Sequence, residues 1–575
     1  MVFKILSNSP KSIYYNLRYL TKFCIQVWSG LQGRSMLFSC IHISVIKWRK
    51  LFQKILQLCL RHSAEQYLYT KMSRGKSNEV PWMDWSQEET FSGSFEKSSL
   101  LTAALTHAGL YILMFLGFIN QLFFKPKVAI ERNREGYAPL YNPFEQFFSR
   151  YLYRRVRHCF NLPVTSTPAA EVTLKQRATD DYNWTFRFTG EEKRCINLGS
   201  YNYLGFAEPR GECADAAEEA AKRYGLALAS SRAELGTCNV HRELEKTTAD
   251  FLGVEDAIVF GMGFATNSMG VPGLIGEGSL VLSDENNHAS LILGLRLARA
   301  TVRVFKHNDM KHLETLARRA IVEGKWKRII VVVEGVYSME GSVVPLRALV
   351  AIKKRYGLYL YLDEAHSVGA MGHRGRGVTD YSGVDPREID ILMGTFTKSF
   401  GAAGGYIAGS RRLVDSVRAR GHGHTYAHSM SPPVAAQVLA AMRAIASPAG
   451  AARVAVLRDN TRYFRERLRS LGVITFGHID SPVVPMLVYT FSKMAATVER
   501  LQERGVATVG VGFPATPLNK ARIRFCLSAA HSRAQLDECL TAIEAVVDEI
   551  GLRYSSTRFK RLSVSRSQKR SAAYE

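Results

Sequence analysis

The sequence predicts an α/β protein with a mostly parallel sheet, a smaller α+β domain after it, and one membrane segment before it. Short β-branched runs alternate with amphipathic helical stretches through the middle of the 575-residue chain. Such alternation is typical of parallel sheets whose crossover helices cover both faces. Toward the C-terminus, long helical stretches precede further strands, which indicates a second domain. Upstream, an apolar stretch without charged residues is long enough to cross a bilayer.

The elements of both domains can be located individually. The expected strands share β-branched and aromatic residues and lie at 257–260, 328–333, 358–362, 483–489 and 522–527. The expected helices have apolar residues three and four positions apart and lie at 213–224, 313–323 and 346–356. We therefore assign residues 134–190 to an N-terminal arm, 191–430 to a large domain and 431–550 to a small domain.

The net charge of +25 would suit a nucleic-acid-binding protein, but most of it lies outside the predicted domains. Residues 1–71 hold 11 Lys and Arg against the single acid Glu65, and residues 551–575 hold 7 against Glu575. A nucleic-acid-binding protein needs its basic stripe on the folded domain, among stacking aromatic residues. We therefore predict no nucleic-acid partner, and interpret the basic flanks as solvated or as facing an anionic membrane surface.

Both ends of the chain differ from the middle. Residues 1–97 are basic and then polar, without the apolar core and cleavage site of a signal peptide. Three interpretations of residues 1–71 stay open: a transit peptide, an interfacial helix, and a gene-model extension upstream of Met72. Residues 551–575, rich in Ser and Arg, are expected to be disordered. Nine scattered cysteines without a C-x-x-C pair predict a reducing compartment and no structural metal.

Residues 98–124 run for 27 positions without a charge and are bounded by Lys97 and Lys125. About 20 apolar residues, rising roughly 1.5 Å each, cross the hydrocarbon core, so this predicted transmembrane segment can span it with tilt. A buried or in-plane helix is the alternative, since the segment includes His107. Four Lys or Arg follow the segment closely against three in residues 72–97, which predicts that its C-terminal side faces the cytosol.

A predicted buried strand ends in Asp363 and is followed three residues later by His366, in the sequence YLYLDEAHS. Both side chains can face one crevice at the carboxyl edge of a parallel sheet. A buried Asp can keep the ring nitrogen of a pyridoxal group protonated by opposite-charge attraction. The same residues would also suit a helix-capping Asp and a structurally satisfied His, so this motif alone leaves both interpretations open.

A single lysine, Lys398, lies among small residues and hydroxyls in GTFTKSFGAAGG at 394–405. Small residues let the backbone approach a bulky ligand, and hydroxyls such as that of Thr395 suit phosphate oxygens. A lysine in a water-poor pocket has a lowered pKa, which favours the neutral amine that forms a Schiff base. The Walker spacing of a nucleotide-binding P-loop is absent, which makes that alternative weak.

A third motif, SDENNHAS at 283–290, places His288 just after an apolar strand. A histidine at a strand end can stack on an aromatic ligand in the same crevice. A structural or solvated loop histidine is the alternative.

Together these motifs resemble those of the α-oxoamine synthases, fold-type I pyridoxal-phosphate enzymes that condense an amino acid with an acyl-CoA. The resemblance covers roughly residues 134–550, and within the family it is strongest to the catalytic second subunits of serine palmitoyltransferase. The similar segments are REGYAPLYNPFEQF (134–147), DYNWTFRFTG (181–190), GFATNSMG (263–270), EGVYSMEGSVVPL (334–346), YLDEAHSVGAMG (361–372), GTFTKSFGAAGGYIAGS (394–410), FPATP (513–517) and RFCLSAAHS (524–532). The resemblance implies a fold-type I transferase, with a large cofactor-binding domain and a small C-terminal domain.

The resemblance also implies which residues surround the cofactor, pyridoxal 5'-phosphate. Lys398 is expected to hold it as a Schiff base, Asp363 to pair with its ring nitrogen, and His288 to stack on its ring. His366 and Ser338 are expected to hydrogen-bond its phenolic oxygen. The other expected contacts are, at the phosphate, Gly263, Phe264 and Thr395 and, at the substrate carboxylate, Arg524.

The implied reaction condenses L-serine with palmitoyl-CoA to 3-ketodihydrosphingosine, CoA and CO2, the first step of sphingolipid synthesis. The resemblance further implies a heterodimer with the first subunit of that enzyme, held in the endoplasmic reticulum membrane with its catalytic domain in the cytosol. One alternative is another α-oxoamine synthase that uses glycine, such as 5-aminolevulinate synthase or glycine acetyltransferase. A second alternative is a non-catalytic membrane scaffold subunit, against which the intact motif around Lys398 argues.

Overall fold

The computed structural model describes residues 96, 100–123, 135–137, 143–517 and 519–555, all within one compact unit, Gln87–Glu575. The predictions for residues 1–71, and for all but the first few residues of the 551–575 tail, lie outside the described residues.

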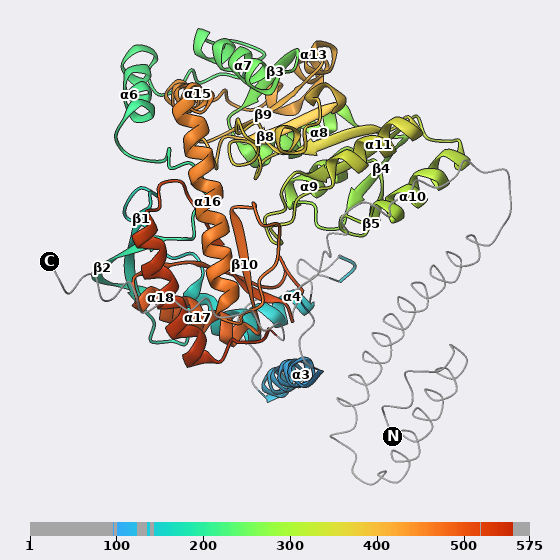
Figure 1. The fold of residues 1–575 in the computed structure, drawn as a ribbon. Helices are drawn as coiled ribbons and strands as arrows, with labels where there is room; N and C mark the ends of the chain where they lie inside the picture. The colour runs from blue at the N-terminus through green and yellow to red at the C-terminus, as the bar shows by residue number, and fades with distance from the viewer. Residues whose placement is uncertain (1–95, 97–99, 124–134, 138–142, 518, 556–575) are drawn as a thin grey trace. The chain divides into compact units, whose positions relative to one another are not determined.

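A seven-stranded sheet forms the centre of the fold, in the order β3-β9-β8-β7-β6-β4-β5 (Figure 1). Its strands are β3 (Asp256–Phe260), β4 (Ser279–Asp284), β5 (Thr301–Phe305), β6 (Arg328–Glu334), β7 (Tyr359–Asp363), β8 (Ile391–Thr395) and β9 (Gly405–Gly409). Each pair from β8 through β5 runs parallel, whereas β9 runs antiparallel to both β3 and β8. The predicted, mostly parallel α/β sheet is therefore confirmed.

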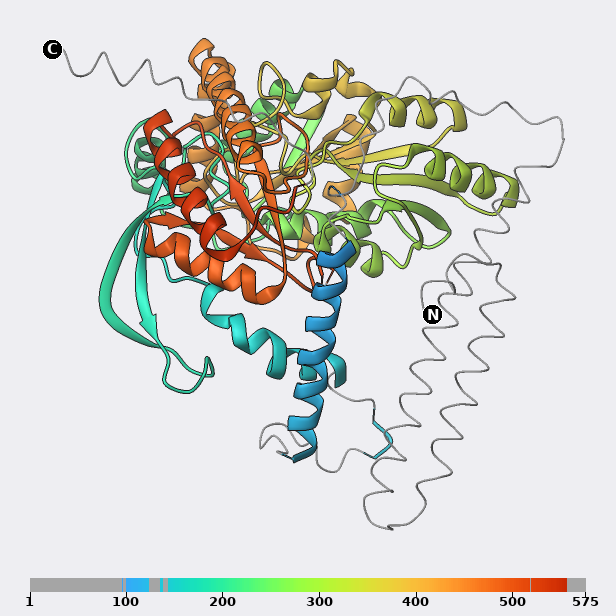
Figure 2. The ribbon, with the colours of Figure 1, turned by 60° about the horizontal axis from the view of Figure 1, so that its bottom comes forward.

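Helices lie before, between and after these strands, and several of them cover the sheet (Figures 1 and 2). They are α6 (Glu212–Tyr224), α7 (Asn239–Leu252), α8 (Gly263–Leu274), α9 (Ala289–Leu297), α10 (Met310–Glu323), α11 (Leu346–Tyr356), α12 (Val378–Ser382), η4 (Pro386–Glu388), α13 (Arg411–Arg420) and α14 (His422–Thr425). Local sequence sets their ends. In α10, the Asp309 side chain accepts from the His312 amide at 2.8 Å, and Gly324 ends the helix in the left-handed conformation.

The inner strands of the large sheet are buried on both faces. Every residue of β4, β8 and β9 is buried, and Val281, Ile330 and Tyr361 share one core cluster with Val271 of α8 and Leu291 of α9. Burial of each large aliphatic side chain stabilises the fold by about 1.5–3 kcal/mol. Side chains at the ends of these strands are therefore carried on a rigid support.

The C-terminal part adds a smaller α+β layer, coloured orange to red in Figure 2. Its elements are α15 (Pro432–Ala446), α16 (Pro448–Ser470), β10 (Val483–Tyr489), α17 (Phe491–Glu503), β11 (Val506–Ala507), β12 (Val509–Val511), β13 (Ala521–Cys526) and α18 (Arg533–Ile550). Strands β10, β13 and β12 form one sheet, while β11 pairs with β2 (Arg187–Asn197), itself paired with β1 (Glu171–Ala178). The N-terminal arm is thereby joined to this layer, and the three predicted domain boundaries remain predictions.

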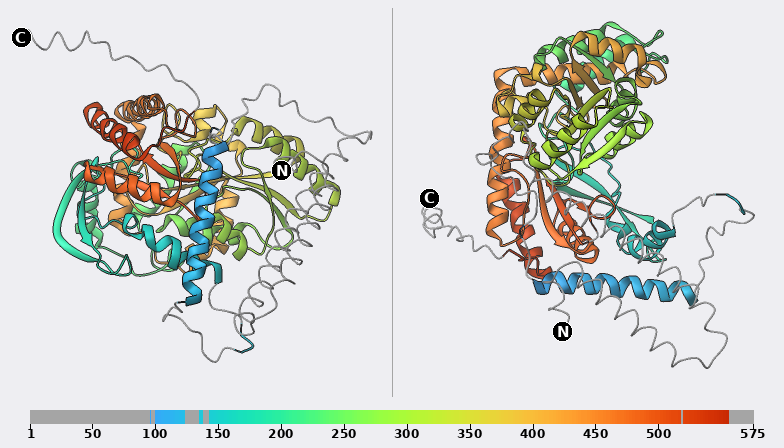
Figure 3. Two further views of the ribbon diagram at one scale, coloured as in Figure 1. Left: turned by 90° about the horizontal axis from the view of Figure 1, so that it is seen from below. Right: turned by 90° about the vertical axis from the view of Figure 1, so that its right-hand side faces the viewer.

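Upstream of β1 lies one long apolar helix, α3 (Leu100–Phe123), followed by α4 (Pro143–Phe148), η2 (Ser149–Tyr153), α5 (Arg154–Val156) and η3 (Arg157–Cys159). Its stretch Leu100–Gln121 has a mean hydropathy of 1.7 and is 6% buried within the protein, so it is long and apolar enough to cross a membrane. Helix α3 lies against η2 (Figure 3), where a Cβ on Gly117 would be 3.1 Å from Tyr151. The predicted segment 98–124 is thus a helix, and its crossing of a membrane remains a prediction.

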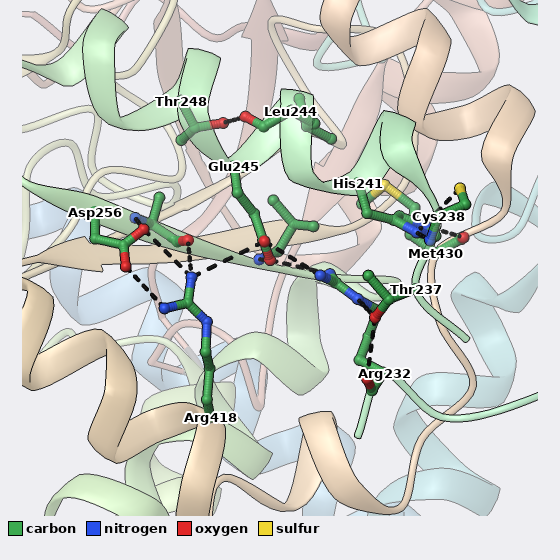
Figure 4. Close-up of polar contacts among 12 residues, drawn as sticks. Arg232, Thr237, Cys238, His241, Leu244, Glu245, Thr248, Asp256, Arg418 and Met430 are labelled. Carbon is green, nitrogen blue, oxygen red and sulfur yellow. Dashed lines mark hydrogen bonds and ion pairs between the residues drawn. The ribbon is translucent and has the colours of Figure 1, made fainter. Parts of the chain in front are cut away.

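A buried ionic network ties α7 to β3 and α13 (Figure 4). Glu245 of α7 accepts two hydrogen bonds from Arg232, at 3.0 and 3.2 Å, and one from the Val259 amide at 3.1 Å. Arg418 of α13 lies 4.0 Å from Glu245 and pairs with Asp256 at 2.8 Å. Because the Arg232 and Glu245 side chains are only 7% and 8% exposed, loss of either leaves an uncompensated buried charge.

We expect Glu245→Ala to lower the free energy of unfolding by about 3 kcal/mol or more, because Arg232 then stays buried without its carboxylate. Glu243→Ala, two residues earlier on α7, is the matched control. Glu243 forms an ion pair with Arg443, and the two side chains are 51% and 61% exposed. Such exposed ion pairs contribute about 0–1 kcal/mol to the free energy of unfolding. Urea denaturation followed by circular dichroism measures both changes, and equal destabilisation by the two substitutions would contradict this role of the network.

Candidate active site

A cavity of about 200 Å³ lies at the carboxyl edge of the central strands. Most of the predicted site residues line it, namely Gly263, Phe264, His288, Asp363, His366, Thr395 and Lys398. The rest of its lining consists of Asn267, Ser290, Glu334, Ala365, Met393 and Thr397. A larger cleft of about 610 Å³ lies beside Leu346 and Val454, but no lysine lines it. The chemistry of its lining, more than its size, therefore marks the smaller cavity as the candidate site.

Strand order explains why these residues meet although they are far apart in the sequence. Glu334 ends β6 and pairs with Asp363, which ends β7. Thr395 ends β8, the next strand along. His288 follows β4, which neighbours β6 on the other side. Because parallel strands present their carboxyl ends at the same edge, all four side chains gather there.

Lys398 lies in the turn between β8 and β9. Its Nζ is 5.7 Å from the centre of the Tyr201 ring. The side chain as a whole keeps partial exposure, but burial of the amine lowers the pKa of Lys398 to about 8. The charges of Asp363 and Glu334 oppose this lowering, and that of Arg524 adds to it. Near neutral pH an appreciable fraction of the amine is therefore unprotonated, the state that attacks a carbonyl carbon.

Asp363 is buried and hydrogen-bonded through both carboxylate oxygens. Oδ2 accepts from Asn267 Nδ2 at 2.7 Å, and Oδ1 accepts from the Ala365 amide at 2.9 Å. Tyr361, two residues earlier on β7, donates its hydroxyl to Asn267 Oδ1 at 2.6 Å. The carboxylate is thus fixed at the cavity wall, where a cationic ring nitrogen would find a partner.

His288 is the N-cap of α9 and is held at both its ring and its backbone. Its Nδ1 lies 2.7 Å from Ser290 Oγ, and its amide donates to Glu334 Oε1. The ring meets that of Phe264 edge-on, with 5.9 Å between centroids. Burial lowers the pKa of His288, with Asp363 opposing and Lys398 adding to the effect. The ring is therefore held in its neutral state at neutral pH.

His366 and Glu334 complete the wall, and burial disfavours the charged form of each. His366 Nδ1 lies 2.9 Å from the Tyr203 hydroxyl, and its ring meets Tyr201 edge-on at 4.9 Å. Burial lowers the pKa of His366 well below its ordinary value, and the charge of Lys398 acts in the same direction. Burial raises the pKa of Glu334 well above its ordinary value, and the neighbouring carboxylate of Asp363 raises it further.

Small residues and hydroxyls form the other end of the cavity. Helix α8 begins at Gly263, so its first amides have no partners within the helix. A Cβ on Gly263 would collide with Thr395 Oγ1, which makes glycine necessary for this close approach. Thr395 Oγ1 donates to the Gly404 carbonyl at 2.9 Å and lies 2.8 Å from Thr397 Oγ1. Free amides beside two hydroxyls suit a phosphate group.

Two predicted site residues, Ser338 and Arg524, are not among the described residues that line the cavity. Ser338 is buried on the loop after β6. Arg524 lies on β13, with its guanidinium 4.5 Å from the centre of the Tyr201 ring, the same ring that neighbours Lys398. Within the described part of the chain, its buried Nε has no hydrogen-bond partner. The guanidinium therefore has a donor available for an anion close to the cavity.

The arrangement fits the predicted cofactor, pyridoxal 5'-phosphate, in three respects. The Lys398 amine suits an aldehyde carbon. The buried carboxylate of Asp363 and the neutral ring of His288 suit a flat ring with a cationic nitrogen. The hydroxyls and free amides around Thr395 and Gly263 suit its phosphate.

Sequence reasoning missed five residues in or beside the site: Asn267, Ser290, Glu334, Tyr201 and Tyr203. A signal existed for three of them, because Asn267 lies in GFATNSMG, Ser290 in SDENNHAS and Glu334 at the start of EGVYSMEG. Nothing in those motifs indicated that the three side chains would meet. The two tyrosines come from the segment after β2, which carried no motif of its own.

Comparisons with known proteins agree with this geometry. The family model for aminotransferase class I and II matches residues 193–543. Serine palmitoyltransferase 3 of Homo sapiens is 49% identical over 479 residues, which cover 80% of this chain and 87% of that protein. The chain belongs to the serine palmitoyltransferase family. Long chain base biosynthesis protein 2a of Arabidopsis thaliana is 43% identical over 478 residues, covering 81% of this chain and 98% of the relative.

Solved structures of serine palmitoyltransferases share the fold. The enzyme from S. paucimobilis, in a structure with a bound PLP-myriocin aldimine, gives a TM-score of 0.63 at 27% identity over 72% of this chain and 100% of that one. The Sphingomonas wittichii enzyme gives a TM-score of 0.64 at 28% identity, over 72% and 99%. The predicted fold-type I architecture and the resemblance to serine palmitoyltransferase are both confirmed.

We expect Asp363→Asn and Arg524→Gln to shift the pKa of Lys398 in opposite directions. The charge of Asp363 raises that pKa, so its removal lowers the pKa below about 8, whereas removal of Arg524 raises it. Mass spectrometry of the Lys398 peptide after amine-selective labelling at a series of pH values measures both shifts in the cofactor-free protein. The exposed Lys222 of α6 is the internal control, and shifts of equal sign would contradict this electrostatic assignment.

Proposed function

We propose that this chain catalyses the decarboxylating condensation of L-serine with palmitoyl-CoA, giving 3-ketodihydrosphingosine, CoA and CO2, the first step of sphingolipid synthesis. The observation that carries the proposal is Lys398, with its lowered pKa, beside Asp363 and His288 in one cavity of a serine palmitoyltransferase fold. Relatives named serine palmitoyltransferase, at 43–49% identity, argue against the glycine-using alternatives. The lysine argues against a non-catalytic scaffold.

Pyridoxal 5'-phosphate is the cofactor of this proposal and, when bound, supplies an electron sink for negative charge at the amino-acid α-carbon. Lys398 would hold it covalently, Asp363 would keep a proton on its ring nitrogen, and the ring of His288 would pack against it. His366 would donate to its phenolic oxygen, with Ser338 supporting from the loop after β6. The hydroxyl of Thr395 and the amides of Gly263 and Phe264 would bind its phosphate.

The protein's own groups then position serine and move one proton. Arg524 binds the serine carboxylate through a donor pair of its guanidinium. The Lys398 amine, with a pKa of about 8, is matched to accept the proton from the α-carbon near neutral pH and to return it after CO2 is lost. Orientation of the α-carbon bonds by these fixed groups supplies most of the remaining rate enhancement.

We further propose that the enzyme acts as a heterodimer with the first subunit, in the endoplasmic reticulum membrane with its catalytic domain in the cytosol. The long apolar helix α3 supports a membrane attachment. Exposed apolar side chains beside the cavity, Met262 at 62% and Phe264 at 44%, support a protein partner at the mouth of the site. A membrane location also suits an acyl chain that partitions into bilayers.

We expect co-expression with a first subunit to give 3-ketodihydrosphingosine, and Lys398→Ala to abolish both the product and the visible imine absorption without unfolding the protein. More product should form from serine than from glycine. More product should also form from palmitoyl-CoA than from acetyl-CoA, because each buried methylene contributes about 0.8 kcal/mol to binding. Mass spectrometry of the products measures these preferences, with Lys222→Ala as the matched control of normal activity. Substantial turnover by Lys398→Ala, or a preference for glycine with acetyl-CoA, would refute the proposal.

For the membrane, we expect a chain that begins at Met72 to resist carbonate extraction, because α3 remains and is long and apolar enough to cross a membrane. Deletion of residues 100–123 should release the protein. A C-terminal tag should be digested by protease added to the cytosolic side of sealed microsomes. Protection of that tag would contradict the orientation, and extraction of the Met72 form by carbonate would contradict the anchor.

A further inference from the structure

A continuous chain of buried hydrogen bonds links Asp363 to His288. Tyr361 donates to Asn267 Oδ1 at 2.6 Å, and Asn267 Nδ2 donates to Asp363 Oδ2 at 2.7 Å and to Ser290 Oγ at 3.0 Å. Ser290 Oγ in turn lies 2.7 Å from His288 Nδ1. Tyr361, Asn267 and Ser290 are 0%, 1% and 2% exposed, so water does not compete for these bonds.

The direction of each bond follows from the chemistry of its groups. The carboxylate of Asp363 only accepts, so the Asn267 nitrogen and not its oxygen must face it. Burial raises the pKa of Tyr361 well above its ordinary value, so the phenol keeps its proton and donates it to Asn267 Oδ1. The second amide hydrogen of Asn267 reaches Ser290 Oγ, which leaves the Ser290 hydroxyl hydrogen for His288 Nδ1.

His288 Nδ1 therefore accepts twice, from the Ser290 hydroxyl and from the Ser290 amide at 3.3 Å. A ring nitrogen that accepts carries no proton, so in the neutral ring the proton is on Nε2. The charged groups that act on the ring, Asp363 and Lys398, oppose each other, while burial favours the neutral form. Burial raises the pKa of Glu334, whose carboxyl accepts from the His288 amide, well above its ordinary value and so disfavours its charged form.

We propose that Tyr361, Asn267 and Ser290 are positioning residues that hold His288 as its neutral Nε2–H tautomer, so that its free nitrogen is a hydrogen-bond donor and not a base. The inference deepens the proposed function and rests on it for the substrate, an amino acid whose carboxylate can accept that bond. The same chain of hydrogen bonds couples Asp363, which we propose for the ring nitrogen of the cofactor, to His288, which we propose for the face of that ring.

The backbone of His288 is fixed by other contacts, which separates the ring from the loop that carries it. Its amide donates to Glu334 Oε1, and the preceding Asn287 donates to the Val332 carbonyl at 2.8 Å and to Ser283 Oγ at 2.9 Å. Removal of the Ser290 hydroxyl therefore leaves the imidazole ring with only the longer bond from the Ser290 amide, at 3.3 Å, while the loop stays tied to β6.

We expect Ser290→Ala to weaken binding of L-serine to the holoenzyme about tenfold, because it removes a buried hydrogen bond and leaves Asn267 Nδ2 one acceptor short. Titration of the cofactor absorbance with serine measures this affinity. The affinity for pyridoxal phosphate should change less than about twofold, since Asp363 keeps its own bond to Asn267. Ser290→Cys keeps a weak donor, so its affinity for serine should lie between that of the unmodified protein and that of Ser290→Ala. Thr248→Val, which removes a buried hydroxyl that donates to the Leu244 carbonyl on α7 at 2.7 Å, is the matched control with unchanged serine affinity.

A double-mutant cycle tests whether Tyr361 and Ser290 act on serine binding through one coupled chain of hydrogen bonds, called the relay below, or through independent packing effects. Tyr361 reaches the His288 ring only through Asn267 and Ser290 among the described contacts, so Tyr361→Phe alone should weaken serine binding about threefold. Combined with Ser290→Ala, it should give about the tenfold loss of the single change, because both break one chain. A thirtyfold loss, the product of independent effects, would overturn the relay.

The tautomer itself is read by 15N NMR of the histidine-labelled holoenzyme without substrate, with the His288 signal assigned by its loss in His288→Asn. An unprotonated Nδ1 with a protonated Nε2 supports the proposal, and its replacement by mixed tautomers in Ser290→Ala supports the role of the hydroxyl. A protonated Nδ1, or a charged ring at neutral pH, would overturn the proposal. Failure of the unmodified holoenzyme to bind serine would count against the proposed function instead, since the tautomer is measured without it.

Discussion

The buried carboxylate of Asp363 is the group on which the rest of the site depends. A buried charge is costly unless it is hydrogen-bonded and paired, and here two donors, Asn267 Nδ2 and the Ala365 amide, provide the hydrogen bonds. Those donors leave the carboxylate facing a cavity that also holds Lys398. The same surroundings also suit a cationic ring.

The register of the strands places a second buried acid, Glu334, beside the carboxylate of Asp363. Because β6 and β7 run parallel in register, Glu334 lies opposite Asp363, and two adjacent buried acids do not both ionise at low cost. Burial and the charge of Asp363 raise the pKa of Glu334 well above its ordinary value, and Glu334 serves as an acceptor for the His288 amide. Arg524, from the small domain, adds positive charge near Lys398 and lowers its pKa, so the reactivity of the amine depends on both parts of the chain.

Much of the fold was predictable, because it depends on patterns within short stretches of sequence. Helix α11 at 346–356 and strand β10 at 483–489 have the predicted bounds, since apolar periodicity and β-branched runs report directly on local structure. Lys398 and Asp363 were predictable because their motifs lie at strand ends. The contact of Asn267 with Asp363 was not, because the two residues are 96 positions apart and meet only through the order of the strands.

The surroundings of two other site residues could not be predicted from the sequence either, because they depend on the tertiary structure. Ser338 was assigned to the cofactor by resemblance; it is buried but is not among the described residues that line the cavity, a matter of loop conformation that sequence does not specify. The sequence assigned no role to Glu334, and only the structure shows that its carboxyl group is buried beside Asp363 and accepts from the His288 amide.

The central claim is that Lys398 is the residue that holds the cofactor. Borohydride reduction of the purified protein bound to pyridoxal phosphate, followed by proteolysis and mass spectrometry, tests it without any assay of turnover. A phosphopyridoxyl group on the peptide that contains Lys398, and on no other lysine, is the predicted result. A label confined to another lysine, or no stable label on a protein that shows the visible absorption of an imine, would contradict the claim.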